Sequence, residues 1–306
     1  MKHAKVAIIG GAGNVGSTIA YALMMQNIVS EIILVDVDQE RLLGQVLDLS
    51  DSLSFSRTSH IYSGSFSQAA QADIIIIAAG KGQLPGQKRS ELLQENARVI
   101  KAIFKSLGPI SSSSIVIMVS NPVDVMTMLA QDYAGLPRKQ VFGSGTFLDT
   151  QRLRRCIGLA LGVGLQSIHV YVLGEHGDDQ FVFWSSATIA GISLAHFKSP
   201  TASECQVMAK QAREEVYSII ESKGATFFGV GACVSAYCEN ILFDQKRVLP
   251  LSCYQSEFGV CMSMPVVLGE CGVEQIFEIS LDDAERKACD KAVVKIRSSY
   301  ELVSDN

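Results

Sequence analysis

The chain has 306 residues, of which 48% are hydrophobic and 19% are charged, so a disordered chain is excluded and one or two globular domains are expected. Its 26 basic and 31 acidic residues give a formal net charge of −5, and no basic cluster exceeds Arg154-Arg155. This balance disfavours a nucleic-acid partner and an anionic membrane surface.

From the N-terminus to about residue 144, short apolar runs alternate with segments of helical pattern. The runs are almost continuously Ile, Val and Ala, which is typical of parallel strands buried on both faces of a sheet. The expected strands are Lys5–Gly10, Glu31–Asp36, Asp73–Gly80, Ser114–Ser120 and Gln140–Gly143. The expected helices are Asn14–Gln26, Arg41–Leu49, Leu92–Leu107 and Val123–Tyr133. This alternation predicts an α/β fold in which residues 1–144 form a doubly wound parallel (Rossmann) sheet.

The second half groups its helices and strands instead of alternating them. The expected order is a helix, two β-type stretches, two helices, two strands and a terminal helix: Asp149–Leu161, Ile168–Leu173, Gln180–Ile189, Ser203–Lys223, Val230–Phe243, Val248–Tyr254, Val260–Leu268 and Leu281–Tyr300. Such grouping predicts an α+β second domain formed by residues 145–306.

Targeting signals and metal-binding patterns are missing from the sequence. Its apolar runs fall far short of the ~20 residues that span a bilayer, and the run Val6–Ile9 stops at Gly10, too early for a secretory signal. No transmembrane segment and a cytoplasmic location are therefore expected. All eight cysteines lie in the second half, without a C-x-x-C pair or histidines at zinc spacing, which favours reduced core residues and no metal site.

A glycine-rich motif stands between the first expected strand and the first expected helix. In Gly11-Ala12-Gly13-Asn14-Val15-Gly16 the backbone can approach a pyrophosphate at the positive end of the helix. Such a pattern alone is weak, but Asp36 ends the second strand, where a carboxylate accepts ribose hydroxyls and repels a 2′-phosphate. Together these features predict NAD in preference to NADP. The cofactor-binding candidates are Gly11, Gly13, Asn14, Val15, Gly16 and Asp36.

Polar clusters follow strand ends or open helices elsewhere in the expected fold. The segment Gly80–Arg89 is polar and contains glycines, as a mobile lid does, and Asn121 follows another strand. Asp149 and Arg152, spaced i and i+3, share one face of a helix. The glycine-flanked His176 fits a general acid or base that Asp149 can hold in one tautomer. The ordinary alternatives are exposed loop residues and a structural histidine.

In this order and over nearly the whole chain, these motifs resemble the L-lactate and malate dehydrogenase family. The resemblance extends to Gly143-Ser144-Gly145-Thr146, Lys223-Gly224-Ala225-Thr226, Val248-Leu249-Pro250 and Pro265-Val266-Val267-Leu268-Gly269. It implies that His176 donates or accepts a proton, that Asp149 pairs with it, and that Arg152 holds the substrate carboxylate. Hydride would pass between the nicotinamide of NAD and a carbon of a small 2-oxo or 2-hydroxy acid.

The same resemblance assigns roles to three further residues. Arg89 would polarise the substrate carbonyl when the lid closes. Asn121 would line the site beside the substrate oxygen and the cofactor, and Thr226 would form part of the wall around the substrate side chain. Residues 145–306 would then be the substrate-binding and catalytic domain, and the assembly would be a homotetramer or a dimer.

Gln83 stands where this family separates its substrates. Malate dehydrogenases carry an arginine there, whose charge neutralises the second carboxylate of oxaloacetate, whereas neutral Gln83 would leave that carboxylate unpaired. The resemblance therefore implies an oxidoreductase of glycolysis and pyruvate fermentation, an NAD-dependent L-lactate dehydrogenase. Gly82 would loosen the loop and Lys81 would add positive charge, so a malate or branched 2-hydroxy acid dehydrogenase is the nearest alternative. The alternative of another class is a catalytically silent NAD-binding protein.

Arg154 and His169 match an allosteric pattern of the same family. In its allosteric bacterial members, an arginine and a histidine from two facing subunits bind the phosphates of fructose 1,6-bisphosphate across a two-fold axis. If these residues act likewise, the bisphosphate relieves repulsion between like charges and favours the assembled, active state, more strongly at mildly acidic pH. The alternative is a solvated basic edge at Arg154 and Arg155 and a histidine satisfied in the core.

Overall fold

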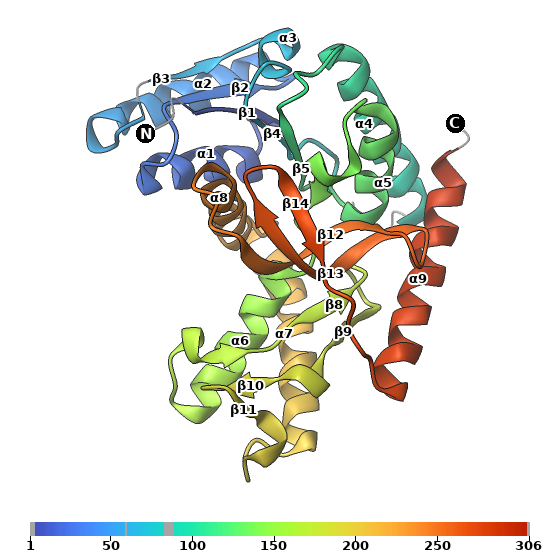
Figure 1. Ribbon diagram of the computed structural model, residues 1–306. Helices are drawn as coiled ribbons and strands as arrows, with labels where there is room; N and C mark the ends of the chain where they lie inside the picture. Colours follow the sequence, from blue (N-terminus) through green and yellow to red (C-terminus); the bar gives the residue numbers. More distant parts are fainter. Residues whose placement is uncertain (1–3, 59, 83–88, 305–306) are drawn as a thin grey trace.

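The computed structural model describes residues 4–58, 60–82 and 89–304, apart from the side chain of Arg89, and Figure 1 traces the chain through them. Its first half forms a parallel sheet in the order β3-β2-β1-β4-β5-β6. The strands are β1 (Lys5–Ile9), β2 (Glu31–Val35), β3 (His60–Ser63), β4 (Ile74–Ile77), β5 (Ile115–Met118) and β6 (Val141–Gly143). The helices are α1 (Asn14–Gln26), α2 (Gln39–Asp51), α3 (Phe66–Ala69), α4 (Arg89–Leu107) and α5 (Val123–Tyr133). The reversal of strand order between β1 and β4 confirms the doubly wound arrangement.

Alternate side chains of the central strand β1 enter two different cores. Val6 and Ile8 pack on one face with residues of α1, and Ala7 and Ile9 pack on the other with residues of α4 and α5. All residues of β4, Ile74–Ile77, are fully buried for the same reason. Because helices cover both faces, these strands are apolar throughout, as their sequences predict.

The second half contains strands of two sheets and the helices that pack on them. Its helices are α6 (Phe147–Leu161), α7 (Ala202–Lys223), α8 (Phe228–Leu242) and α9 (Asp283–Ser304). Its strands are β7 (Ile168–His169), β8 (Val172–Gly174), β9 (Gln180–Val182), β10 (Thr188–Ile189), β11 (Ile192–Ser193), β12 (Arg247–Gln255), β13 (Val260–Gly269) and β14 (Gly272–Ile276). Short 3-10 turns are η1 (Leu53–Phe55), η2 (Arg138–Gln140), η3 (Leu165–Ser167), η4 (Trp184–Ser186) and η5 (Leu194–His196). The grouping of antiparallel strands and helices is the expected α+β arrangement.

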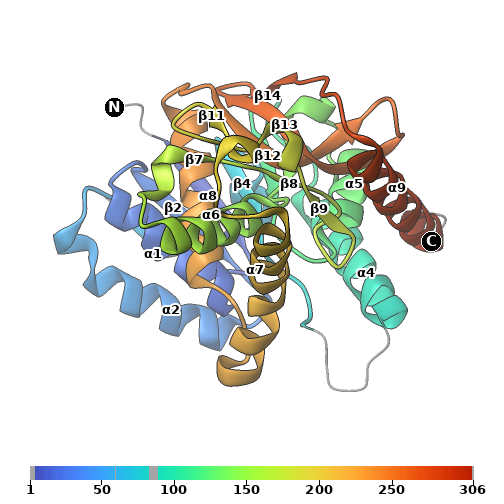
Figure 2. The same cartoon turned by 90° about the horizontal axis from the view of Figure 1, so that it is seen from below.

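One continuous sheet joins the two halves. The antiparallel pair β12 and β13 is extended by β8, β9 and β14, and β12 also pairs with β6 through Ser252 and Gly143. Helix α8 lies beside α1 in both Figure 1 and Figure 2, and the hydroxyl of Ser235 donates to Oε1 of Gln26 at 2.6 Å between them. The carboxyl end of the parallel sheet is therefore held directly against the second half.

Two expected β-type stretches are wrong as continuous strands. Ile168–Leu173 is divided into β7 and β8, and Gln180–Ile189 into β9 and β10 with η4 between them. The reason is a change of sheet, because β7 pairs with β10 in a small sheet while β8 pairs with β13 in the large one. The short elements β3, α3, β11 and β14 are absent from the sequence prediction. Within the described ranges, no helix has the length and apolarity needed to cross a membrane.

Candidate active site

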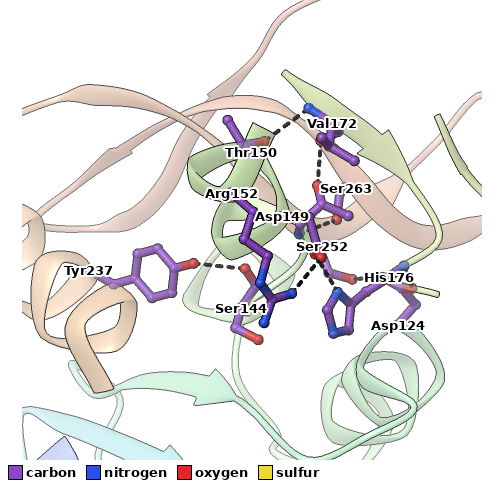
Figure 3. Close-up of polar contacts among 11 residues, drawn as sticks. Asp124, Ser144, Asp149, Thr150, Arg152, Val172, His176, Tyr237, Ser252 and Ser263 are labelled. Carbon is purple, nitrogen blue, oxygen red and sulfur yellow. Dashed lines mark hydrogen bonds and ion pairs between the residues drawn. The ribbon is translucent and has the colours of Figure 1, made fainter. Parts of the chain in front are cut away.

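Three of the predicted catalytic residues form one hydrogen-bonded cluster. Asp149 lies in the first turn of α6, Arg152 follows one turn later, and His176 comes directly after β8. The Oδ2 atom of Asp149 is 2.9 Å from Nδ1 of His176, and its Oδ1 atom accepts a hydrogen bond from Nη1 of Arg152 at 3.1 Å. Figure 3 shows the imidazole and the guanidinium beside this carboxylate. Asp149 therefore orients both neighbouring groups.

Asp149 and His176 stabilise each other's charged forms. Burial raises the pKa of Asp149, but the charges and hydrogen bonds of His176 and Arg152 outweigh it and bring the pKa below its ordinary value. Burial lowers the pKa of His176, but the charge and hydrogen bond of Asp149 outweigh it and bring the pKa above its ordinary value. The His176 side chain is still 27% exposed, against 7% for Asp149. This arrangement presents an accessible proton donor.

A second buried carboxylate, Asp124, contacts His176 from the first half of the molecule. Its Oδ2 atom accepts the backbone N–H of His176 at 2.8 Å, and its Oδ1 atom accepts the hydroxyl of Ser252 at 2.6 Å. Burial raises the pKa of Asp124 to about 6, although both hydrogen bonds oppose this rise. His176 is thus bonded to one carboxylate through its ring and to another through its backbone (Figure 3).

Two threonines fix the corner where α6 begins. The hydroxyl of Thr146 donates to the carbonyl of Val172, and the hydroxyl oxygen of Thr150 accepts the N–H of Val172 at 2.9 Å. Val172 begins β8, and His176 follows the end of that strand. These bonds hold the start of α6 against β8, which places Asp149 next to His176 (Figure 3).

The predicted glycine motif forms a tight turn between β1 and α1. A Cβ on Gly16 would lie 2.2 Å from the carbonyl oxygen of Gly10, and one on Gly11 would lie 2.9 Å from Cβ of Leu34. Gly10, just before the predicted motif, has φ +92, and a Cβ there would lie 2.6 Å from the backbone nitrogen of Ala79. Only residues without side chains allow this close approach of strand and helix.

The N-terminus of α1 is left open by this turn. Gly13 is its N-cap and supplies no side-chain cap, and the first turn contains no acidic residue. The backbone N–H groups of Asn14 and Val15 have no acceptor among the residues that the structure describes. Free N–H groups at a helix N-terminus attract anions, so this turn fits the pyrophosphate of a dinucleotide.

Asp36 lies beside the glycine turn, as the cofactor prediction requires. Its Oδ2 atom accepts the N–H of Ala12 at 3.0 Å, and its Oδ1 atom accepts the N–H of Asp38 at 3.1 Å. A cation lies near the same turn, because Nη2 of Arg41 on α2 donates to Oδ1 of Asn14 at 2.9 Å. The structure therefore brings the predicted cofactor-binding residues of the glycine motif and Asp36 together around the start of α1.

The remaining predicted site residues do not join the histidine cluster by hydrogen bonds within the described ranges. Asn121 is exposed after β5, and its carbonyl accepts a hydrogen bond from Nδ2 of Asn96 at 2.8 Å. Thr226 is half-buried on the connection between α7 and α8. Gln83 and the side chain of Arg89, the first residue of α4, lie outside what the structure describes.

Arg154 contacts the backbone beside His169 within one subunit. The guanidinium of Arg154 donates from Nε and Nη2 to the carbonyl of Val170 at 3.3 and 3.2 Å, next to His169. His169 is exposed on β7. The alternative of a core histidine with its hydrogen bonds satisfied is therefore wrong, because the side chain of His169 is exposed.

Sequence reasoning assigns no role to two buried polar residues of the site: Asn96, which it does not single out, and Asp124, which it sees only as part of the polar cluster that begins at Asn121. Asn96 is 1% exposed and ties the loop after β4 to the loop after β5: its Oδ1 accepts the N–H of Lys81 at 2.8 Å, and its Nδ2 donates to Asn121. Both residues stand at core positions of helices that are otherwise apolar there. A polar residue on the buried stripe of a helix is the sequence signal for such a role.

Cysteine, histidine and acidic side chains are scattered through the described part of the chain. No group of three or more His, Cys, Asp or Glu residues there could hold a metal ion. All eight cysteines lie within the described ranges and are free, and all are buried except half-buried Cys156 and exposed Cys271. The expectation of reduced core cysteines therefore holds for most of them.

Family models and known proteins match this chain over almost its whole length. The model for the lactate/malate dehydrogenase NAD binding domain matches residues 4–143, and the model for the lactate/malate dehydrogenase alpha/beta C-terminal domain matches residues 146–305. L-lactate dehydrogenase A of Rhizopus oryzae is 44% identical over 296 residues, which covers 97% of this chain and 92% of that protein. L-lactate dehydrogenase of Chloroherpeton thalassium is 38% identical over 305 residues, covering 98% of this chain and 100% of that protein. The crystal structure of minor L-lactate dehydrogenase from Enterococcus mundtii, in a ligands-bound form, has a TM-score of 0.94 at 33% identity and covers 99% of both chains.

Proposed function

This chain belongs to the lactate/malate dehydrogenase family, and we propose that it acts as an NAD-dependent L-lactate dehydrogenase on pyruvate and L-lactate. The observation that carries the proposal is the cluster of Asp149, His176 and Arg152, because it joins a proton donor to a cation that can bind a carboxylate. The named relatives favour lactate over malate or branched 2-hydroxy acids. The intact cluster disfavours a catalytically silent protein.

His176 moves the proton of the reaction. In pyruvate reduction its Nε2–H, on the side of the ring away from Asp149, donates to the substrate carbonyl oxygen. In lactate oxidation the neutral ring accepts the hydroxyl proton. Asp149 stabilises the imidazolium before the transfer and holds the proton on Nδ1 after it, so the ring keeps one tautomer throughout.

Arg152 binds and orients the substrate. One of its N–H groups is committed to Asp149, and the fork of the guanidinium offers further donors for a bidentate contact with the substrate carboxylate. Following the family's pattern, we assign Arg89 to polarising the substrate carbonyl, Asn121 to the substrate oxygen and the cofactor, and Thr226 to the wall around the substrate side chain.

Residues 1–144 hold the cofactor and residues 145–306 hold the substrate in this proposal. The turn Gly11–Gly16 binds the pyrophosphate, and Asp36 accepts the ribose hydroxyls. Held by these residues, NADH would supply the hydride for reduction of the substrate carbonyl. The carboxyl end of the parallel sheet, where doubly wound folds bind ligands, faces the second half through β6 and β12.

A steady-state assay with pyruvate, oxaloacetate and 2-ketoisocaproate tests this function. Pyruvate should give the highest kcat/KM, and His176→Asn should lower kcat by about 10²–10⁴-fold, the usual contribution of a general acid. NADH binding, followed by its fluorescence, should persist in that variant. His60→Asn on β3 is the matched control, because that histidine is exposed, and it should keep wild-type activity. Full activity of His176→Asn contradicts the assignment, and a preference for oxaloacetate favours malate dehydrogenase.

We propose that Gln83 sets the substrate preference by its lack of charge. Gln83→Arg should shift preference from pyruvate toward oxaloacetate by orders of magnitude, because pairing one buried carboxylate is worth several kcal/mol and each ~1.4 kcal/mol is about tenfold. The measurement is the ratio of kcat/KM for the two substrates. Gln87→Arg, in the same segment, is the control. An unchanged ratio in Gln83→Arg contradicts this role.

We further propose that the protein is a cytoplasmic homo-oligomer, a dimer or a tetramer. Leu43 and Leu47 share one face of α2 and are 57% and 60% exposed, and Phe55, just beyond the helix, is 81% exposed. Figure 2 shows α2 at the outer edge of the molecule. Large apolar side chains gathered at such an edge favour a contact with another subunit. The cytoplasmic location follows from the pool of pyruvate and NADH that glycolysis maintains there.

Fructose 1,6-bisphosphate is the effector that we propose for Arg154 and His169. The charged guanidinium of Arg154 lies at the carbonyl of Val170, the residue that follows exposed His169, so both side chains could serve one phosphate group. Pyruvate saturation of dilute enzyme should show a lower apparent KM with millimolar bisphosphate, and the effect should be larger at mildly acidic pH. It should vanish in His169→Gln but persist in His196→Gln. If the bisphosphate changes neither the apparent KM for pyruvate nor the molecular mass of the assembly, at neutral or mildly acidic pH, the proposed effector site is contradicted.

A further inference from the structure

We infer that Asp124 is a positioning residue of the reaction, which holds the backbone of His176 in a fixed place relative to the loop that carries Asn121. The inference rests on the proposed function, because the place of His176 matters only if this histidine transfers the proton. It adds a residue for which the family resemblance supplied no role.

The contacts of Asp124 connect three segments that are distant in sequence. Asp124 is the second residue of α5, three residues after Asn121. One carboxylate oxygen accepts the backbone N–H of His176 at 2.8 Å, and the other accepts the hydroxyl of Ser252 on β12 at 2.6 Å (Figure 3). A single side chain thus links the end of β5, the loop after β8 and the strand that joins the two halves.

Asp124 is buried although burial of a charged carboxylate is unfavourable in free energy, which indicates that its charge has a functional role. It is 2% exposed, and no lysine or arginine in the described ranges pairs with it. A neutral amide could make both contacts, because its oxygen would accept the N–H of His176 and its nitrogen would donate to the hydroxyl oxygen of Ser252. An uncompensated buried carboxylate is disfavoured, so its presence directly behind His176 points to an electrostatic contribution as well as an anchoring one.

Charged and titratable groups surround this pair from every packed element. Asp149 and Arg152 of α6 flank the imidazole, Glu175 precedes His176 on the same loop, and the thiols of Cys253 and Cys261 on β12 and β13 lie near Asp124. In this setting Asp149 fixes the ring and Asp124 fixes the main chain. The two negative charges together favour the imidazolium, which is the form that donates the proton.

The variant Asp124→Asn separates charge from anchoring, because it keeps the shape and the hydrogen bonds. Pyruvate reduction requires protonated His176, so kcat/KM falls as pH rises through the pKa of that group. Loss of the nearby charge should move this fall to lower pH by about half a unit or more. The maximum of kcat should stay within a few-fold of wild type. Asp124→Ala also removes the anchor and should lower kcat/KM at least tenfold at every pH, with NADH binding retained.

Glu285→Gln is the matched control for a merely structural carboxylate. Glu285 is 5% exposed and likewise accepts a backbone N–H and a hydroxyl, both from Ser185, at 2.9 and 2.8 Å. Its substitution should affect the unfolding temperature and leave the pH profile in place. Thermal unfolding establishes first that each variant is folded, and if Asp124→Ala is not, the profile of Asp124→Asn alone decides. Wild-type kcat/KM in folded Asp124→Ala overturns the positioning role, and an unmoved profile in Asp124→Asn overturns the electrostatic contribution. A wild type that does not reduce pyruvate overturns the proposed function instead.

Discussion

His176 receives its properties from the residues bonded to it. A half-buried histidine without a partner would lose its proton readily, since loss of hydration disfavours the charged ring. Asp149 reverses this tendency through a bond of 2.9 Å, and its own pKa is lowered in return. The single aspartate therefore serves both the protonation state and the orientation of the ring.

Asp149→Asn should weaken proton transfer and change its pH dependence. The charge and hydrogen bond that raise the pKa of His176 are lost while the opposing burial remains, so the pKa of His176 should fall. The loss of pyruvate reduction with rising pH should then begin at a lower pH than in the wild type. The maximum kcat should also be reduced by about 10²–10⁴-fold. The measurement is kcat against pH for pyruvate reduction, with Asp51→Asn at the exposed end of α2 as control. If kcat of Asp149→Asn falls with rising pH over the same range as the wild type, the coupling of Asp149 to His176 is contradicted.

Asp36→Ser should relax the choice of cofactor. The variant loses acceptors for the ribose hydroxyls and the charge that repels a 2′-phosphate, so NADH should bind more weakly and its advantage over NADPH should narrow. Comparison of kcat/KM for the two cofactors at saturating pyruvate tests this. Asp38→Ser is the neighbouring control. A wild type that uses both cofactors equally contradicts the role of Asp36.

The role of a residue can be predicted from the sequence only where its partners lie close to it in the chain. Asp149 and Arg152 are three positions apart on one helix, and glycines flank His176, so these residues are visible in the sequence. The contacts of Asp124 are of another kind, because His176 is 52 and Ser252 is 128 positions away from it. Its place depends on how β8 and β12 approach α5, which no local pattern specifies.

The turn between β1 and α1 is the element that we propose binds the pyrophosphate of the cofactor. Helix α1 can begin so near β1 only because Gly16 has no side chain. The carbonyl of Gly10 occupies the space that any larger residue at position 16 needs. Strand, turn and helix are therefore one unit whose geometry is set by backbone contact.

Gly16→Ala should disrupt that unit. Its Cβ would lie 2.2 Å from the carbonyl oxygen of Gly10, so the helix must shift, and we expect a loss of about 2 kcal/mol or more in the free energy of unfolding. NADH affinity should fall as well. Gly44→Ala on α2 is the control, because a Cβ added there would meet no atom within 4 Å, and it should be neutral or stabilising by up to ~1 kcal/mol. Denaturant unfolding and NADH fluorescence measure both effects; wild-type values for Gly16→Ala contradict this account.

Elements with a strong apolar pattern are predicted well, and elements defined by a distant partner are not. The bounds of α1 and α5 agree with the sequence expectation, since caps and periodicity mark them locally. The expected strand Ile168–Leu173 fails because the chain changes from the small sheet to the large one within it. The strand β14 is recognised only through its pairing with β13.

The molecule as a whole presents an apolar face on α2 that an assembly would cover. Leu47→Asp should lower the molecular mass measured by light scattering, because a buried unpaired carboxylate opposes association. Val294→Asp on α9 is the control, since that side chain is 64% exposed and Figures 1 and 2 show α9 on the opposite side of the molecule from α2. A mass unchanged by Leu47→Asp excludes this face as the contact.

The overall architecture is the level at which sequence reasoning is most incomplete. Alternation of strands and helices predicts the doubly wound half, and the grouped pattern predicts the α+β half. The pairing of Gly143 with Ser252, which merges the two into one sheet, joins positions far apart in the chain. The partition at residues 144 and 145 therefore stays a prediction about roles, and the sheet is paired across it.

Because the two halves share one sheet, they are expected to fold only together, even though we assign them separate roles in binding the cofactor and the substrate. A fragment that ended at residue 144 would leave β6 with an unpaired row of backbone donors and acceptors on its outer side. It would also uncover Ile19 and Leu23 of α1, which pack in one core with Val234 of α8. Bare strand edges and apolar faces promote aggregation, so the cofactor half is expected to be insoluble when expressed by itself. Attempts to exchange cofactor halves between relatives must carry β12 and α8 along with them.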